Sequence, residues 1–425
     1  MPPSLREIEG GLRRTTETLA ATLTASEISG AIAQWNELDW QLAPAAAAAH
    51  GVGPLLGELQ GWRNPEWREF LATQRAHVEA RHHRIEALLE RIDRDARASG
   101  LAFVTLKGAA LHALGVYAPG QRPMADVDLL VREADLEAAT RLLQNAGYVH
   151  SFDHWRHRVL KPAAGEPPRC LGEHRDTPVN IELHTHVGER LPVTPVDITG
   201  RIHPREPQPG LNPYPSIAAL MSHLLLHAAG NICGRTLRLL HLHDIALLAR
   251  RMTAIDWEEF RVADSTDAPW WAVPSLRLVT RYYPDAIPAA VLEELARVCP
   301  PLLNTISKRQ TLTQVSCSRL WLQALPGIEW SRSLREAATY MKQRVRPPTE
   351  KIRERNDMVR SQLWLQQRDW ATAAHWRRVL TALTRRVPRM DVLYVLRLAL
   401  EARSPGDEER TAGFDQRVAT ASVKL

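Results

Sequence analysis

Two aspartates separated by one residue stand directly before a run of aliphatic residues, and this feature restricts the fold more than any other in the chain. In the segment 124–131, MADVDLLV, Asp126 and Asp128 precede the run LLV. Residues i and i+2 of a β-strand project from the same face, which places the two backbones about 7 Å apart. The segment therefore predicts a strand that is mostly buried and carries two carboxylates near its start.

A second segment, 178–187 with the sequence PVNIELHTHV, alternates between apolar and polar residues. Such alternation predicts a half-buried strand, and Glu182 and His184 share its polar face. Glu182 is therefore the candidate for a third carboxylate beside Asp126 and Asp128. Carboxylate oxygens are preferred ligands of Mg²⁺, and two such ions can clamp the oxygens of a phosphoryl transfer. The alternative interpretation is a D-x-D pair in a solvated turn.

Helical and β-type segments are unevenly distributed along the 425 residues. Residues 1–98 are rich in helix-forming residues, 99–215 contain the β-type segments, and 216–402 are again helical. Within the central part, the Pro-rich stretch 192–215 is expected to be a linker. The polar tail 403–425 is expected to be disordered. The sequence thus predicts an α+β core flanked by N-terminal and C-terminal helical regions.

Composition restricts the setting in which the protein works. Four cysteines form no CxxC pair, which argues against a disulfide framework and is typical of the reducing cytoplasm. The N-terminal residues lack an apolar signal segment, and no uninterrupted apolar stretch approaches the roughly 20 residues of a transmembrane helix. The net charge of +6 is mild for this length and permits an anionic partner. We therefore expect a cytoplasmic protein with no transmembrane segment.

The motifs LKGAALHALGVY, GQRPMADVDLLV and NIELHTH together resemble the uncharacterised bacterial nucleotidyltransferases of the DNA polymerase beta-like superfamily. That superfamily has a strand, a glycine turn into a helix, a strand bearing D-x-D, and a later strand with a third acidic residue. Asp126 and Asp128 match the D-x-D pair. Gly108 matches the glycine turn, and Glu182 matches the third acid. The resemblance covers roughly residues 35–257.

The resemblance implies a small mixed sheet and a metal-dependent transferase. The enzyme would move a nucleoside monophosphate from an NTP to an unidentified hydroxyl acceptor, which could be a small molecule, a protein or a nucleic acid. Asp126, Asp128 and Glu182 would be the catalytic residues and the ligands of Mg²⁺ or Mn²⁺. The alternative is a catalytically inactive nucleotide-binding or scaffold protein that retains the fold.

The expected nucleotide-binding turn departs from the superfamily pattern, because it reads KGAA and offers no hydroxyl group. Backbone N–H groups at the start of the following helix could hold phosphate, and a lysine and an arginine could supply positive charge. The predicted nucleotide-binding residues are Lys107, Gly108, Ala109, Arg122 and His184. The alternatives are a surface position for Lys107 and a turn in which Arg122 pairs with Asp126.

Three close carboxylates have an electrostatic consequence. Without a cation, their mutual repulsion is expected to raise the pKa of at least one of them. Replacing Asp128 by asparagine is expected to relieve this repulsion and leave the melting temperature at or above that of the metal-free wild type.

Other polar residues in the helical region have simpler explanations. His223 and His227 share a helical face but enclose LLL with no glutamate, so packed core histidines are favoured over a zinc site. Asp244 is expected to make a helix–helix contact. The arginine-rich region 332–403 is typical of solvated faces on amphipathic helices, and an anionic partner is the alternative.

Overall fold

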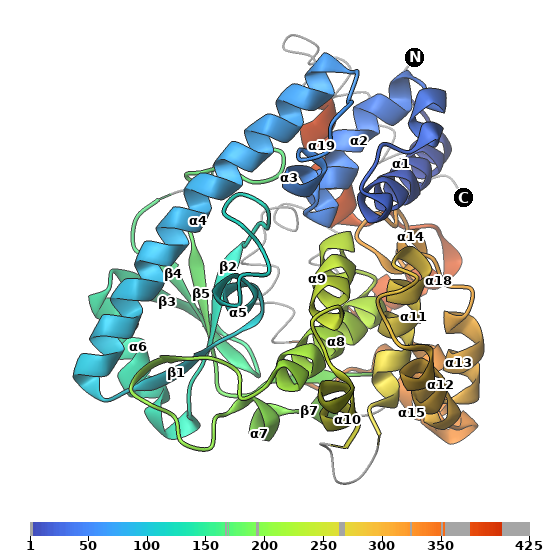
Figure 1. Cartoon of the computed structure of the whole chain (residues 1–425). Coiled ribbons are helices and arrows are strands. Elements are labelled where there is room, and N and C mark those ends of the chain that lie inside the picture. The colour runs from blue at the N-terminus through green and yellow to red at the C-terminus, as the bar shows by residue number, and fades with distance from the viewer. Residues whose placement is uncertain are drawn as a thin grey trace.

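The computed structural model describes residues 3–401 except 166, 167, 169, 193, 194, 263–267, 324, 350, 351 and 353–374. The tail expected to be disordered, 403–425, lies outside the described residues. The described chain combines one mixed β-sheet with helices that precede and follow it (Figure 1). This is the α+β class that the sequence predicts.

The main sheet has six strands in the order β3-β4-β5-β2-β1-β8. Its strands are β1 Ala102–Thr105, β2 Asp126–Leu130, β3 Tyr148–Asp153, β4 His157–Pro162, β5 Asn180–His184 and β8 Gly210–Asn212. The pairs β2–β5 and β1–β8 are parallel, and the other neighbours are antiparallel. A separate pair of short strands consists of β6 Gly188–Arg190 and β7 Pro195–Asp197.

One face of the sheet is covered by the long helix α4, Pro65–Ser99, and by α6, Leu136–Asn145 (Figure 1). Val127 and Leu129 of β2 belong to the apolar cluster beneath these helices. Leu130 points the other way and joins the larger core formed by the remaining helices. Because neighbouring residues of a strand alternate between faces, Asp126 and Asp128 lie on the same side as Leu130. The carboxylates therefore face away from α4.

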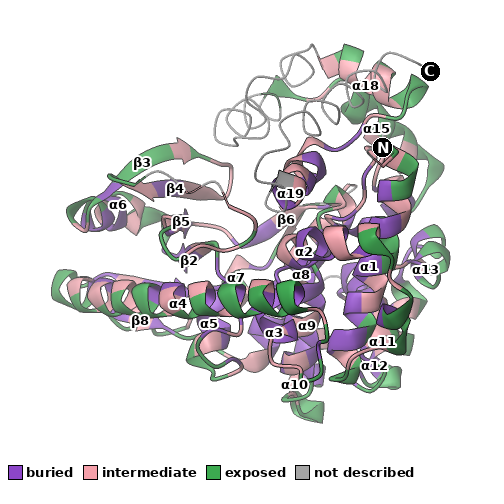
Figure 2. Ribbon diagram, turned by 90° about the horizontal axis from the view of Figure 1, so that it is seen from above, coloured by how far each residue is buried: buried purple, intermediate pink, exposed green. Residues whose placement is uncertain are grey.

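The opposite side is occupied by the helical part of the chain. Figure 2 shows α2, α3, α8 and α9 as mostly buried elements at its centre. The other α-helices among the described residues are α1 Leu5–Ala25, α2 Glu37–His50, α3 Gly53–Leu56, α5 Lys107–Ala113, α7 Thr199–Ile202, α8 Ile217–Gly234, α9 Leu239–Ala249, α10 Ala254–Val262, α11 Val273–Tyr282, α12 Ala289–Val298, α13 Pro301–Ser307, α14 Leu312–Val315, α15 Leu334–Val345, α18 His375–Thr384 and α19 Met390–Glu401.

Helix α8 is the central helix of this part. Its N-cap is Ser216, whose hydroxyl accepts the N–H of Ala219 at 3.1 Å, and its C-cap is Arg235 in the left-handed region. Among the described residues, α8 is the one helix long and apolar enough to cross a membrane by length and composition alone. Since 67% of that stretch is buried inside the protein, packing against α9, α10 and α11 accounts for its apolar character.

One strand was not predicted, and one segment differs from its prediction. Strand β3 shows no apolar–polar alternation, because it lies at the sheet edge with most of its side chains exposed. The stretch 192–215, expected to be a linker, contains β7, α7 and β8. β8 is only three residues long and is held as a strand by its pairing with β1, which no local pattern reveals.

The arginine-rich C-terminal region is partly described. Helix α19 packs against α2, and the buried Arg389 donates to the carbonyl of Ser316 at 3.2 Å and to Asp391. This part agrees with amphipathic helices packed on the core. Helix α18 leaves Trp376 and Leu380 exposed. An anionic partner for this region stays a prediction.

Candidate functional site

The three predicted carboxylates meet on one face of the sheet. Strands β2 and β5 run parallel, with Asp128 directly opposite Glu182 in the register. Asp126 lies two residues before Asp128 and so projects from the same face. Strand pairing thus places three acidic side chains side by side, although Glu182 follows Asp128 by more than fifty positions in the sequence.

Lys107 contributes a cation to this carboxylate cluster. It is the first residue of α5, its φ angle is 46°, and its backbone N–H donates to Tyr214 Oη at 3.2 Å. Its amino group lies 2.7 Å from Asp128 Oδ1, and its side chain is only 16% exposed. The alternative of a surface lysine is therefore wrong. The turn directs Lys107 into the cluster.

Two histidines border the cluster from the strands. His184 Nε2 donates to Asp128 Oδ1 at 2.9 Å and lies 3.5 Å from Glu182 Oε2. His157, the first residue of β4, has its Nδ1 3.7 Å from the same glutamate oxygen. His184 is thus placed where it can orient both acids, on the strand face that it was predicted to share with Glu182.

The three carboxylates differ in their protonation. Burial, together with the charges of Asp128 and Glu182, raises the pKa of Asp126 to about 7. Burial acts in the same direction on Asp128, but Lys107 and His184 outweigh it and hold the pKa of that carboxyl well below its usual range. For Glu182, burial is likewise outweighed by the hydrogen bond from His184, and the pKa is lowered to about 2. The expected repulsion is confirmed, and Asp126 is the residue that bears it.

The carboxylates open into a cavity between the sheet and the helices. Its volume is about 340 Å³, within the range of small-molecule sites. Residues of the core line one side: Lys107, Gly108, Arg122, Pro123, Met124, Ala125, Asp126, Asp128, Arg156, His157 and Glu182. Residues of α8, α9 and the segment between them line the other: Leu224, His227, Asn231, Thr236, Arg238, Leu240, His241 and Asp244.

Comparison with protein families gives one match. A family model described as an uncharacterised nucleotidyltransferase covers residues 36–283, which is more than half of the chain. The chain belongs to this nucleotidyltransferase family. No curated protein and no solved structure matches the chain. The matched range includes the sheet and extends through α11, so both walls of the cavity lie within the nucleotidyltransferase family region.

Arg122 has a different partner in the structure from the one considered in the sequence. Its guanidinium is buried and donates from Nε and Nη2 to the two carboxylate oxygens of Asp244, each at 2.8 Å. Tyr117 Oη donates to the same carboxylate at 2.7 Å. An Arg122–Asp126 pair is therefore wrong. Asp244 makes the satisfied contact that was expected, but with the turn before β2 and not with another helix.

This ion pair also explains the glycine at the turn. A Cβ atom added to Gly108 would lie 2.4 Å from Arg122 Nη1 and 3.0 Å from Met124. Gly108 lines the cavity, whereas the neighbouring Ala109 is buried and is not among the lining residues. Except for Ala109, the predicted nucleotide-binding residues thus lie at or beside the cavity. Arg122 lines the cavity, but its charge is already compensated by Asp244.

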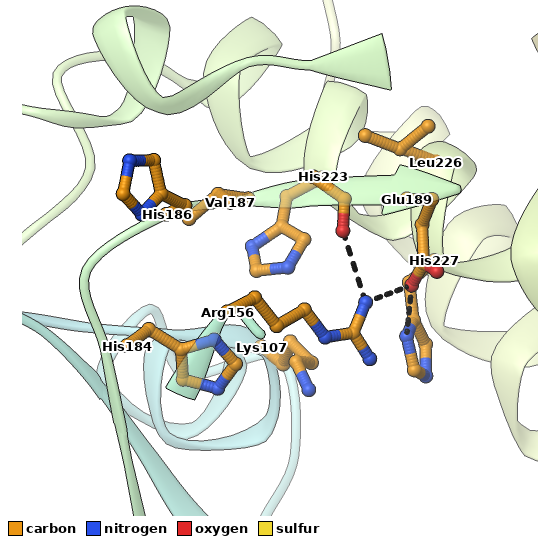
Figure 3. Close-up of a pocket in the computed structure, with 10 residues that line it drawn as sticks. Lys107, Arg156, His184, His186, Val187, Glu189, His223, Leu226 and His227 are labelled. Atoms are coloured by element: carbon orange, nitrogen blue, oxygen red, sulfur yellow. Dashed lines mark hydrogen bonds and ion pairs between the residues drawn. The ribbon is translucent and has the colours of Figure 1, made fainter. Parts of the chain in front are cut away.

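Sequence reasoning missed two arginines of the cavity and assigned one of its histidines to the core. Arg156 donates from Nη1 to the Gly188 carbonyl at 3.0 Å and to Glu189, and Figure 3 shows it beside Lys107 and His184. His227 also faces Glu189, with Nδ1 3.7 Å away. Arg238 is exposed at the N-cap of α9. The two arginines belong to no motif, and only the packing of α8 and α9 against the sheet brings the three residues to one cavity.

The predicted core histidines therefore have two different environments. His223 is buried and accepts a hydrogen bond from Tyr214 Oη at 2.7 Å, as expected for a packed histidine. His227, one turn later on α8, lines the cavity. The i,i+4 spacing predicted that His223 and His227 share one face of a helix. It could not show that His227 lies where this face borders the cavity.

Proposed function

We propose that the protein transfers a nucleoside monophosphate from an NTP to a hydroxyl acceptor, as a divalent-metal-dependent enzyme of the DNA polymerase beta-like superfamily. The observation that supports this most strongly is the register of β2 and β5, which sets Asp128 opposite Glu182 with Asp126 on the same face, at a cavity. An array of three carboxylates on adjacent strands suits phosphoryl transfer, in which catalysis consists mainly of positioning and charge compensation.

The residues present fit a hard divalent cation. Asp126, Asp128 and Glu182 offer carboxylate oxygens, which Mg²⁺ and Mn²⁺ prefer. Burial and the charges of Asp128 and Glu182 raise the pKa of Asp126, and a bound cation would counter that negative charge. We assign Asp126, Asp128 and Glu182 as the residues that would hold the ion. When bound, the ion would act as a Lewis acid that lowers the pKa of the attacking hydroxyl and stabilises charge on the transferred phosphate.

Basic residues on both walls of the cavity suit the anionic part of the nucleotide. Arg238, Arg156 and Lys107 line the cavity. Arg156 is already paired with Glu189 and Arg122 with Asp244, whereas Arg238 is exposed at the N-cap of α9. Because a guanidinium group matches phosphate oxygens with paired hydrogen bonds, we assign Arg238 to the phosphates. The acceptor remains open among a small molecule, a protein and a nucleic acid. All four cysteines are free, which supports a cytoplasmic location.

The test is incubation with each NTP, radiolabelled in the α-phosphate, together with Mg²⁺ or Mn²⁺ and cell extract as the source of acceptor. We expect pyrophosphate release and transfer of label by the wild type, and loss of both in Asp126→Asn and Asp128→Asn. Asp285→Asn, which changes an exposed carboxylate in another part of the chain, is the matched control and should retain activity. Equal signals from the wild type and both site variants would refute the proposal. NTP binding without turnover would instead support the inactive nucleotide-binding alternative.

A further inference from the structure

A second group of potential metal ligands lies at the edge of the carboxylate cluster. His157 on β4 and His184 on β5 are direct partners in the antiparallel register, and Glu182 precedes His184 by two residues on the same face. One ligand atom from each residue lies within 4.8 Å of the other two. The glutamate oxygen is 3.5 Å from His184 Nε2 and 3.7 Å from His157 Nδ1.

His157 shows an unsatisfied ligand atom at this point. Its side chain is only 8% exposed, and Nδ1 has no hydrogen-bond partner among the described residues. A buried polar nitrogen without a partner is costly, because it loses its bond to water and gains nothing in return. The imidazole is fixed in place, since the ring of His154 stacks on it with centroids 4.7 Å apart and the ring of His184 lies at 4.8 Å. A ligand that bonds to Nδ1 would remove this cost.

We propose that His157, Glu182 and His184 bind a divalent transition-metal ion of the zinc class, in a site that shares Glu182 with the carboxylate cluster. Two imidazole nitrogens and one carboxylate are the protein ligands of a typical catalytic zinc site, whereas Mg²⁺ takes oxygen ligands. Metal–ligand bonds of about 2.0–2.1 Å at tetrahedral angles require ligand atoms about 3.3 Å apart. The distances of 3.5 Å and 3.7 Å to the glutamate oxygen approach this value.

The position of the site makes it accessible. His157 and Glu182 both line the cavity, so a small ligand that enters the cavity can reach an open coordination position. In the metal-free protein His184 Nε2 donates to Asp128 Oδ1 at 2.9 Å, so a bound metal ion would replace the proton on Nε2 and end this hydrogen bond. The site is therefore of the three-ligand type that leaves a position for water or substrate.

The test is titration of the full-length, metal-free protein with Co²⁺, followed by visible absorption. We expect one Co²⁺ per chain, displaced by stoichiometric Zn²⁺ but not by millimolar Mg²⁺. His157→Gln should weaken Co²⁺ binding by about a hundredfold or more, since loss of a ligand exceeds the tenfold to hundredfold effect of losing a supporting residue. His186→Gln, a change on the same segment but outside the ligand group, is the matched control and should bind Co²⁺ as the wild type does.

A second measurement does not depend on any variant. Proton NMR of the Co²⁺-loaded wild type should show two paramagnetically shifted imidazole N–H signals, one for each coordinated histidine. Absence of Co²⁺ binding, unchanged binding in His157→Gln, or absence of imidazole signals would each overturn the inference. The outcome is separable from the proposed transfer reaction, because Asp126→Asn should lose nucleotidyl transfer and keep the Co²⁺ site. An active wild type without a Co²⁺ site would refute only the inference about His157.

Discussion

Lys107 and His184 both bind the same oxygen of Asp128, the lysine amino group at 2.7 Å and the imidazole Nε2 at 2.9 Å. The carboxylate of Asp128 thus has an ion-pair partner in Lys107 and a hydrogen-bond partner in His184. Asp126, on the same strand face, has its pKa raised to about 7 by burial and by its acidic neighbours. Two aspartates that look equivalent in the sequence therefore have opposite electrostatic roles, and this difference can be measured.

Removal of the lysine charge should destabilise the metal-free protein. In Lys107→Met, Asp128 keeps its charge but loses its ion-pair partner, and breaking a largely buried pair costs about 3 kcal/mol. Urea unfolding of the wild type and the variant measures the difference. Mg²⁺ or Mn²⁺ should restore part of the loss, because a bound cation replaces the missing charge. Lys161→Met on β4 is the control, and an unchanged unfolding midpoint for Lys107→Met would contradict the role of the ion pair.

The two aspartates should respond differently to substitution by asparagine. Asp126→Asn removes a repelled carboxylate, so at pH 8 the metal-free variant should gain about 1–2 kcal/mol in the free energy of unfolding. Asp128→Asn leaves Lys107 without its counter-ion and should lose stability. This revises the expectation, drawn from the sequence, that Asp128→Asn would melt at or above the wild type. Thermal unfolding without metal checks both variants, and a higher melting temperature for Asp128→Asn would show that the revision is mistaken.

Metal affinity should depend on pH through Asp126. The cation binds the ionised carboxylate, so below the pKa of about 7 protons compete with metal, and affinity should rise about tenfold per pH unit before levelling off. The same raised pKa means that the metal-free fold gains stability from Asp126 only at low pH and loses it as pH rises through about 7. Calorimetric titration with Mn²⁺ from about pH 5 to about pH 8.5 tests this. In Asp126→Asn the pH dependence should disappear, and a flat profile in the wild type would argue against Asp126 as a ligand.

The pair Arg122–Asp244 should be structural. Each single change, Arg122→Met or Asp244→Leu, leaves a buried charge without a partner and should cost about 3–5 kcal/mol. The double variant should lose less than the sum of the two single losses, because neither charge then remains. Denaturant unfolding of the four proteins gives this double-mutant cycle. If Arg122 instead binds phosphate, Arg122→Met would raise the KM for the nucleotide and leave unfolding unchanged.

Local sequence patterns were sufficient for the two strands that carry the acids. The run after Asp128 is fully apolar because both sheet faces are covered: Leu129 packs beneath α4, and Leu130 packs into the helical core. The alternation around Glu182 marks a strand whose polar face reaches the cavity. The spacing of Asp126 and Asp128 within one strand, and the alternation around Glu182 in another, were therefore enough to predict that these three residues belong to one site.

Contacts distant in the sequence could not be predicted in this way. The partner of Arg122 is 122 positions away, on a helix of the C-terminal part. His157 reaches Glu182 only through the pairing of β4 with β5, across a segment in which sequence patterns are weak. The different states of Asp126 and Asp128 depend on Lys107, whose positive φ angle at a non-glycine position has no sequence signature. These features arise from tertiary packing, which a single sequence does not display.

The carboxylate of Asp244 satisfies Arg122 and Tyr117 at the same time, and it does so across the boundary between the sheet and the helices. A change at any one of these positions leaves a buried polar group without its hydrogen-bond partner. Evolution can therefore alter the three residues only in concert, and sequences of related chains should show covariation that links the turn before β2 to α9. A fragment ending at residue 215 would separate Arg122 from its counter-ion, so the sheet cannot be cut out as an autonomous module without redesign of that turn.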